Sequence, residues 1–372
     1  MAQYLFGNGK DKEKGSKRAG GKPIYLNKPA RRLPPWMLPL GLTVLLVLLI
    51  FVLLPALLRT ESDSNKASEG AGMEANARLE QAAASDSVKV GDMVISASGE
   101  LPIYDGADRN AVRISGALFG EKMEVLGLVG DRQLKIRLEG LGEGYVSRSG
   151  VSTDLGTIRK DGLKGRALVL SPLKRIMSHG IAGSLLMEAP MGSLLYADAQ
   201  VEKVLRLRLP DGKEGWMNTD GIQLLAPAEA IPVPAKATEL FVSSAMNFYG
   251  SRVIPGGLSK NGADMAGVIF ISARVNGLDL PRTLEAQSRV GQEADIIRDV
   301  STNLPRPSLF RAGDVLFFHS GEEADKIITA AMMIDKSRAL TILNNSSEIR
   351  IIDLDDQPEL LARLSTARRY FP

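Results

Sequence analysis

The stretch from Trp36 to Leu58 constrains this chain most, because it carries no charged side chain over a length that matches the hydrocarbon core of a bilayer. Backbone amides inside such a core must bond to one another, so an isolated span is a helix. A buried core helix would usually keep a polar face. A cleaved signal peptide has a shorter apolar region followed by small residues, whereas Leu57, Leu58 and Arg59 follow here. The sequence therefore predicts a transmembrane helix over Trp36–Leu58.

The charges that flank this stretch predict its orientation. Lysine and arginine dominate the segment before Trp36, whereas the segment after Arg59 is mixed to acidic. Because basic residues near a span resist translocation, we expect residues 1–35 to be a disordered cytoplasmic tail. Residues 59–87, rich in Ser, Ala and Glu, are expected to form a flexible linker. The prediction is a single-pass protein of a bacterial inner or plasma membrane, with most of the chain periplasmic or extracytoplasmic.

The composition excludes several classes of chemistry. The chain has no cysteine, which excludes disulfides, thiolate metal sites and cysteine nucleophiles. Its net charge of +3 resides mostly in the basic tail and gives no nucleic-acid signature. No phosphate-cradling glycine loop, dinucleotide fingerprint or metal-ligand cluster stands out, so no cofactor and no metal are expected.

An internal repeat follows residue 88. Leu134–Leu138 followed by Glu143–Val146 recurs, with the same spacing, as Leu205–Leu209 followed by Glu214–Met217. Short apolar runs interrupted by glycine and proline indicate an all-β structure. The sequence therefore predicts two small β domains, over 88–155 and 163–228.

Each copy places Gly-Tyr or Gly-Trp at the start of a strand after a glycine-containing hairpin, most clearly in Leu207–Met217. This pattern resembles the bacterial SH3-like barrels of cell-envelope proteins. In that family such barrels bind cell-wall peptides or act as rigid spacers, which makes Tyr145 and Trp216 candidate binding residues. Core packing at a strand start is the more ordinary role for both side chains.

A proline-rich connector over 226–234 precedes a region of mixed pattern. Thr238 can cap a helix that runs to Tyr249, and a second helix is expected from Asp264 to Asn276. Helices first and strands later favour an α+β domain. The expected later elements are strands at 315–318, 327–334, 340–343 and 349–352, and a closing helix over Pro358–Tyr370.

Several motifs in this region resemble the NlpC-type cell-wall cysteine peptidases. They are Ala245-x-x-Phe248-Tyr249-Gly250, Asp264-Met265-Ala266-Gly267, Leu280-Pro281-Arg282-Thr283 and Ala312-Gly313-Asp314-Val315-Leu316-Phe317-Phe318. These papain-like endopeptidases cut peptidoglycan stem peptides next to γ-D-glutamyl residues, and many carry SH3-like barrels ahead of the catalytic domain. The resemblance implies a papain-like α+β domain over 235–372.

The residues that perform catalysis in that family are missing. The family reads Asp-Cys-Ser-Gly where this chain has Asp264-Met265-Ala266-Gly267, and Thr329 stands at the matching position for the histidine. A thioether has no proton to lose and forms no nucleophilic anion. The resemblance thus implies a pseudoenzyme with Met265 and Thr329 as degenerate positions. A peptidase with another nucleophile is the rival, with Ser243, Ser244, Ser259 or Thr329 available and no activating base placed by the sequence.

The substrate side has changed as well. Val253 replaces the aromatic residue that the family uses to line its peptide subsite, while Asp264 and Arg282 are retained. Asp264 and Arg282 could pair with each other or with a peptide terminus, and Asp264 could instead cap a helix. We therefore expect a membrane-anchored, non-catalytic envelope protein that binds peptidoglycan or scaffolds an envelope complex. A pure assembly or regulatory subunit is the alternative.

Overall fold

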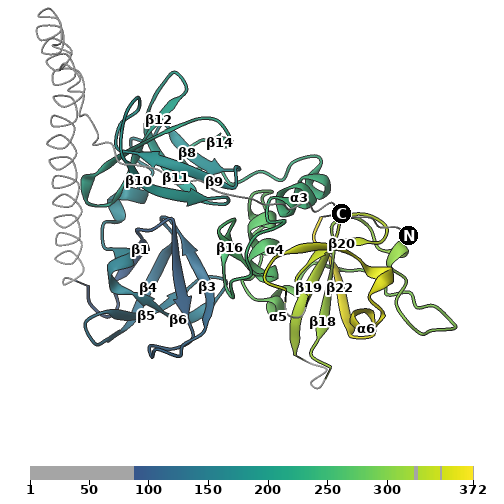
Figure 1. The fold of residues 1–372 in the computed structure, drawn as a ribbon. Coiled ribbons are helices and arrows are strands. Elements are labelled where there is room, and N and C mark those ends of the chain that lie inside the picture. The colour runs from purple at the N-terminus through teal and green to yellow at the C-terminus, as the bar shows by residue number, and fades with distance from the viewer. Residues whose placement is uncertain (1–87, 322–325, 344–345, 372) are drawn as a thin grey trace, which may run out of the picture. The chain divides into compact units, whose positions relative to one another are not determined.

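The computed structural model describes residues 88–321, 326–343 and 346–371 (Figure 1). The chain divides into two compact units, Met1–Met73 and Glu74–Pro372, and every described residue belongs to the second. The described residues form two seven-stranded sheets, one two-stranded sheet and one six-stranded sheet, together with short helices.

The membrane-spanning part of the predicted fold class needs correction. The longest described helices, α3 (Ala237–Met246) and α4 (Met265–Arg274), have 10 residues each. Each is about 15 Å long, half of the bilayer core of about 30 Å. Among the described residues, no helix is long and apolar enough to cross a membrane. The predicted helix Trp36–Leu58, the tail 1–35 and the linker 59–87 lie outside the described residues. The single-pass membrane localisation is therefore not supported.

The first sheet is antiparallel, with strand order β3-β2-β6-β5-β4-β1-β7. Its core consists of apolar side chains that alternate along the strands, as in β5, where Leu134, Ile136 and Leu138 are buried. Its strands are β1 (Met93–Ser96), β2 (Glu100–Tyr104), β3 (Arg113–Leu118), β4 (Lys122–Val129), β5 (Gln133–Leu138), β6 (Gly142–Ser147) and β7 (Val151–Ser152).

The second sheet repeats this topology strand for strand, in the order β10-β9-β13-β12-β11-β8-β14. The internal repeat of the sequence is thus one sheet topology used twice. Phe119, from the turn between β3 and β4, packs into the core of the second sheet and ties the two together. The strands are β8 (Gly165–Val169), β9 (Leu173–Met177), β10 (Leu185–Pro190), β11 (Leu194–Val201), β12 (Val204–Arg208), β13 (Glu214–Asn218) and β14 (Ile222–Leu225).

The glycine of each Gly-aromatic pair is explained by close approach of two strands. A Cβ added at Gly144 would lie 2.4 Å from Cγ2 of Ile103 on β2. A Cβ added at Gly215 would lie 2.5 Å from Cγ2 of Ile176 on β9, the equivalent strand. Real Cβ atoms do not approach other carbon atoms this closely, so both positions require glycine for packing.

Gly144→Ala is therefore expected to reduce the free energy of unfolding by about 1–3 kcal/mol, because the methyl group overpacks the first core. Urea denaturation followed by circular dichroism measures this change. The matched control is Gly127→Ala in the same sheet, where a Cβ would meet only Cβ of Lys135 at an ordinary 3.7 Å. Equal stability of the two variants would contradict the packing explanation.

The remaining described elements begin with α3. The third sheet has the order β17-β22-β18-β19-β20-β21, and β15 pairs with β16 alone. Besides α3 and α4, the elements are β15 (Leu258–Ser259), β16 (Gly262–Ala263), α5 (Leu284–Gln287), β17 (Gln292–Glu293), β18 (Asp314–His319), β19 (Ile327–Met333), β20 (Arg338–Thr341), β21 (Arg350–Asp353), α6 (Pro358–Leu361) and β22 (Leu364–Arg369).

Helix α4 lies at the centre of this region, and every residue from Met265 to Ala273 is buried. Strand β18 is buried on both faces. Val315 and Phe317 join the core that contains α3 and α4, whereas Leu316 and Phe318 join a second core that contains α6. This double burial fixes β18 between β19 and β22, and α4 packs beside β19.

The predicted closing helix is wrong over most of its length. Only Pro358–Leu361 is helical, and Leu364–Arg369 forms strand β22 beside β18. Burial of Leu364 and Ala367 in the second core outweighs their local helical preference. Arg369 adds a bidentate ion pair with the buried Asp314, through Nε at 2.8 Å and Nη2 at 2.7 Å, which holds the strand in register.

Candidate functional site

A cleft of about 610 Å³ opens at the N-terminus of α4. One wall comes from β19, a second from the loop before β15, and a third from the start of α5. Its lining residues are Ile114, Val253, Pro255, Asp264, Met265, Ala266, Arg282, Thr283, Leu284, Glu285, Ile327, Ile328, Thr329, Ile342, Leu343 and Ser346.

Met265 is the first residue of α4, and only 1% of its surface is exposed. Thr329, on β19, lines the same cleft, and its Oγ1 donates to the carbonyl oxygen of Ile342 at 3.5 Å. The structure thus brings together the two positions where the resemblance expects a nucleophile and a base. The described lining holds no histidine, and the chain holds no cysteine.

The two histidines of the chain lie away from this lining. His319 ends β18, where its Nδ1 accepts a hydrogen bond from the amide of Gly321 at 3.0 Å. His179 lies in the loop between β9 and β10. Neither histidine therefore lines the cleft beside Met265.

Asp264 is the N-cap of α4 and also anchors a loop. Its Oδ1 accepts the amide of Gly267 at 2.8 Å, and its Oδ2 accepts the amide of Gly256 at 2.6 Å. Burial raises the pKa of this carboxyl group, and the two amides and the Arg113 charge offset part of that rise. The capping bond satisfies an amide at the helix start, and the second bond holds the loop that carries Val253 against the cleft.

Arg282 is buried and does not bond to Asp264. Its Nη1 donates to the carbonyl oxygen of Gly116 at 2.6 Å, and its Nη2 donates to both carboxylate oxygens of Glu121, at 2.7 and 2.8 Å. The guanidinium also lies over the ring of Phe270, 4.3 Å from the centroid. Both polar partners belong to the first sheet and its β3–β4 turn, so Arg282 attaches that sheet to the cleft.

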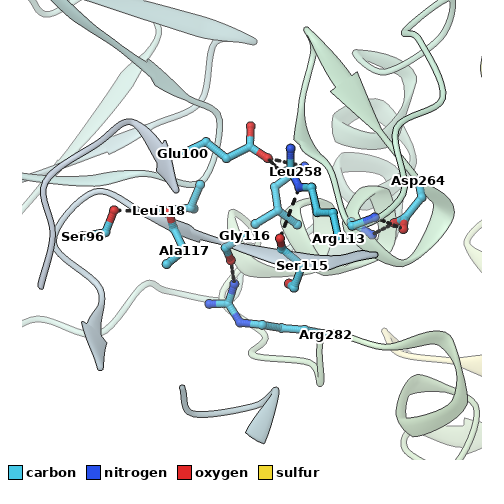
Figure 2. A network of polar contacts seen from close by, with 12 residues as sticks. Ser96, Glu100, Arg113, Ser115, Gly116, Ala117, Leu118, Leu258, Asp264 and Arg282 are labelled. Atoms are coloured by element: carbon cyan, nitrogen blue, oxygen red, sulfur yellow. Dashed lines mark hydrogen bonds and ion pairs between the residues drawn. The ribbon is translucent and has the colours of Figure 1, made fainter. Parts of the chain in front are cut away.

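Strand β3 is the edge strand of the first sheet, and it forms part of the cleft wall through Ile114. Glu100 pairs with Arg113 and also accepts the amide of Leu258 at 2.8 Å (Figure 2). Gly256 has a φ of +63°, and a Cβ there would lie 2.5 Å from the amide nitrogen of Ser115. The loop before β15 therefore packs directly on the edge of the first sheet.

The sequence-predicted binding residues divide into two groups. Val253, Asp264 and Arg282 line the cleft, whereas Trp216 and Tyr145 do not. Trp216 lies on β13 beside Gly180, and Tyr145 pairs with Tyr104 across β6 and β2. Sequence reasoning missed Ile114, because nothing in β3 indicates that a distant loop covers it.

No protein-family model matches the sequence. A γ-D-glutamyl-L-lysine dipeptidyl-peptidase of Bacillus cereus is 26% identical over 167 residues, which are 45% of this chain and 46% of that protein. The match thus spans about half the length of the curated relative.

Two solved structures share the fold. An NlpC/P60 family protein of Bacillus cereus aligns over 76% of this chain and 100% of its own, with 18% identity and a TM-score of 0.65. An NlpC/P60 endopeptidase of Photobacterium damselae aligns over 76% of this chain and 74% of its own, with 11% identity and a TM-score of 0.52. The recognition made from the motifs is confirmed: this chain resembles the NlpC/P60 family in sequence and has the fold of its solved members.

Proposed function

We propose that this protein is a non-catalytic NlpC/P60-type protein whose cleft binds γ-D-glutamyl-containing stem peptides of peptidoglycan. The observation that carries the proposal is Met265, a side chain that cannot ionise, at the first turn of α4 in the cleft. The helix dipole would stabilise the thiolate form of a cysteine at a helix N-terminus. A thioether carries no charge for the dipole to stabilise.

The form of the cleft supports binding. Its volume of about 610 Å³ suits a short peptide, and its lining combines apolar side chains with a few polar groups, as ligand sites do. The B. cereus relative is named for a γ-D-glutamyl-L-lysine substrate, which suggests the ligand class. A cleft of this form can recognise a peptide without hydrolysing it.

The test uses the purified full chain and the tripeptide L-alanyl-γ-D-glutamyl-L-lysine. Calorimetry should detect binding, and chromatography of the same mixture should detect no new amino termini. Cleavage of the tripeptide that survives repurification of the protein and disappears when one Ser or Thr is substituted would refute this proposal. The protein would then be a hydrolase with an unusual nucleophile. If the chain binds neither the tripeptide nor intact sacculi, the result would indicate an assembly protein.

Ile328→Arg should weaken tripeptide binding at least about tenfold, because Ile328 lines the cleft and is 40% exposed. A long charged side chain at that point occupies the cleft without disturbing a core. The matched control is Ile297→Arg, on a loop outside the cleft where Ile297 is 51% exposed. Calorimetry of both variants measures the difference in affinity. Equal affinities of the two variants would show that the tripeptide does not bind in the cleft.

A further inference from the structure

A second cavity, of about 620 Å³, lies where the first sheet, the second sheet and α4 meet. Glu121 comes from the β3–β4 turn, Tyr196 from β11, and Arg274 from α4. Ile158 and Phe270 provide apolar walls, and Arg282 lines both this junction cavity and the cleft. Small-molecule sites occur preferentially at such interfaces between folded parts.

Charged groups of both signs line the junction cavity. Oε1 of Glu121 lies 3.0 Å from Nη1 of Arg274 and 2.7 Å from Nη2 of Arg282. Its Oε2 accepts Nη2 of Arg282 at 2.8 Å and the amide of Leu118 at 2.9 Å. The Glu121 carboxylate therefore pairs with two guanidinium groups, and both of its oxygens already accept hydrogen bonds. The rim carries Lys122, Glu139 and Asp279, which are exposed, and the negative charge of Asp279 also acts on Arg282.

Several donors in the junction cavity are unused among the described residues. Nε of Arg282 is buried and has no hydrogen-bond partner. Nε of Arg274 donates to the carbonyl oxygen of Gly192 at 3.0 Å, and Nη1 of Arg274 pairs with Glu121. Nη2 of Arg274 makes no hydrogen bond to a described residue. The hydroxyl of Tyr196 likewise bonds to no described residue, and burial raises the pKa of Tyr196, so the hydroxyl stays protonated.

From this geometry we propose that the junction cavity binds a small molecule that carries a carboxylate on an apolar body. The carboxylate would accept from the Tyr196 hydroxyl and the free edge of the Arg274 guanidinium. The apolar body would lie against Ile158 and Phe270. This cavity is distinct from the stem-peptide cleft, although Arg282 lines both, and the proposal does not depend on the function proposed for the cleft.

The test uses the full chain with 4-phenylbutyrate and its neutral isostere 4-phenylbutyramide as probes. Calorimetry or ligand-observed NMR should show the acid binding at least about tenfold more tightly than the amide, because only the acid makes charge-assisted bonds. Tyr196→Phe should weaken the acid about three- to tenfold while keeping the ring in place. The control Tyr249→Phe, on a tyrosine that is 52% exposed, should leave the affinity unchanged.

Three outcomes would overturn the proposal. They are equal affinity for acid and amide, no binding of either, and an unchanged affinity of a folded Tyr196→Phe variant. A competition experiment with saturating stem tripeptide distinguishes binding in the cleft from binding in the junction cavity. If it displaces phenylbutyrate, the acid occupies the cleft and the junction site is refuted. If both ligands bind together, the junction site stands whether or not the cleft function is correct.

Discussion

Glu121→Gln is expected to lower the free energy of unfolding by about 3–5 kcal/mol, because it removes the one carboxylate that pairs with both Arg274 and Arg282 among the described residues. Glutamine keeps the shape of the side chain but leaves two guanidinium groups, one of them 4% exposed, without their paired carboxylate. Urea denaturation monitored by circular dichroism measures the loss.

The same variant should change the acid dependence of stability. Burial alone would raise the pKa of Glu121, but the charges of Arg282 and Arg274 hold it below the ordinary value of 4.5. A pKa that is lower in the folded state means that the stabilisation is complete above the unfolded pKa and is lost as the pH falls through the folded pKa. Glu121→Gln should therefore show a flatter acid limb than the parent protein.

The matched control is Glu124→Gln on the surface of the first sheet. Glu124 pairs with Arg137 at 3.0 Å, but both side chains are well exposed, so the loss should stay below about 1 kcal/mol. A loss of similar size for Glu121→Gln would mean that the buried pair does not hold the first sheet to α4.

Combining Met265→Cys with Thr329→His should create a reactive thiol in the cleft. The chain has no other cysteine, so alkylation by iodoacetamide reports on this position alone. The helix N-terminus favours thiolate in Met265→Cys alone, and a neighbouring imidazolium favours it further. Because Met265 is 1% exposed, the reference is the same position, and we expect the double variant to be alkylated at pH 7 about tenfold faster than Met265→Cys alone. Peptide mass spectrometry over time measures the rate.

The single variants separate the two contributions. Met265→Cys alone should react more slowly than the double variant, because it lacks the imidazole, and Thr329→His alone should not react. A double variant that is folded but no more reactive than Met265→Cys would show that the two side chains do not meet. Cleavage of the stem tripeptide by the double variant would further support the assigned cleft.

Local rules predicted much of the α4 region. A carboxylate before an apolar run predicted a capped helix at Asp264, and helix α4 begins at Met265 with that cap. The expected strands at 315–318 and 327–334 correspond to β18 and β19. The closing segment failed because Leu364–Arg369 gains more from burial beside β18 than from helix propensity, and that burial is not visible locally.

The amino-acid sequence by itself determined the repeated sheet, the family resemblance and the absence of a cysteine, because these depend on residue type and spacing along the chain. Only the tertiary structure decided that Ile114 of β3 walls the cleft and that Glu121 unites Arg274 with Arg282. The physical reason is that these contacts join segments far apart in the chain. Their geometry depends on how the folded parts pack, and no local pattern encodes it.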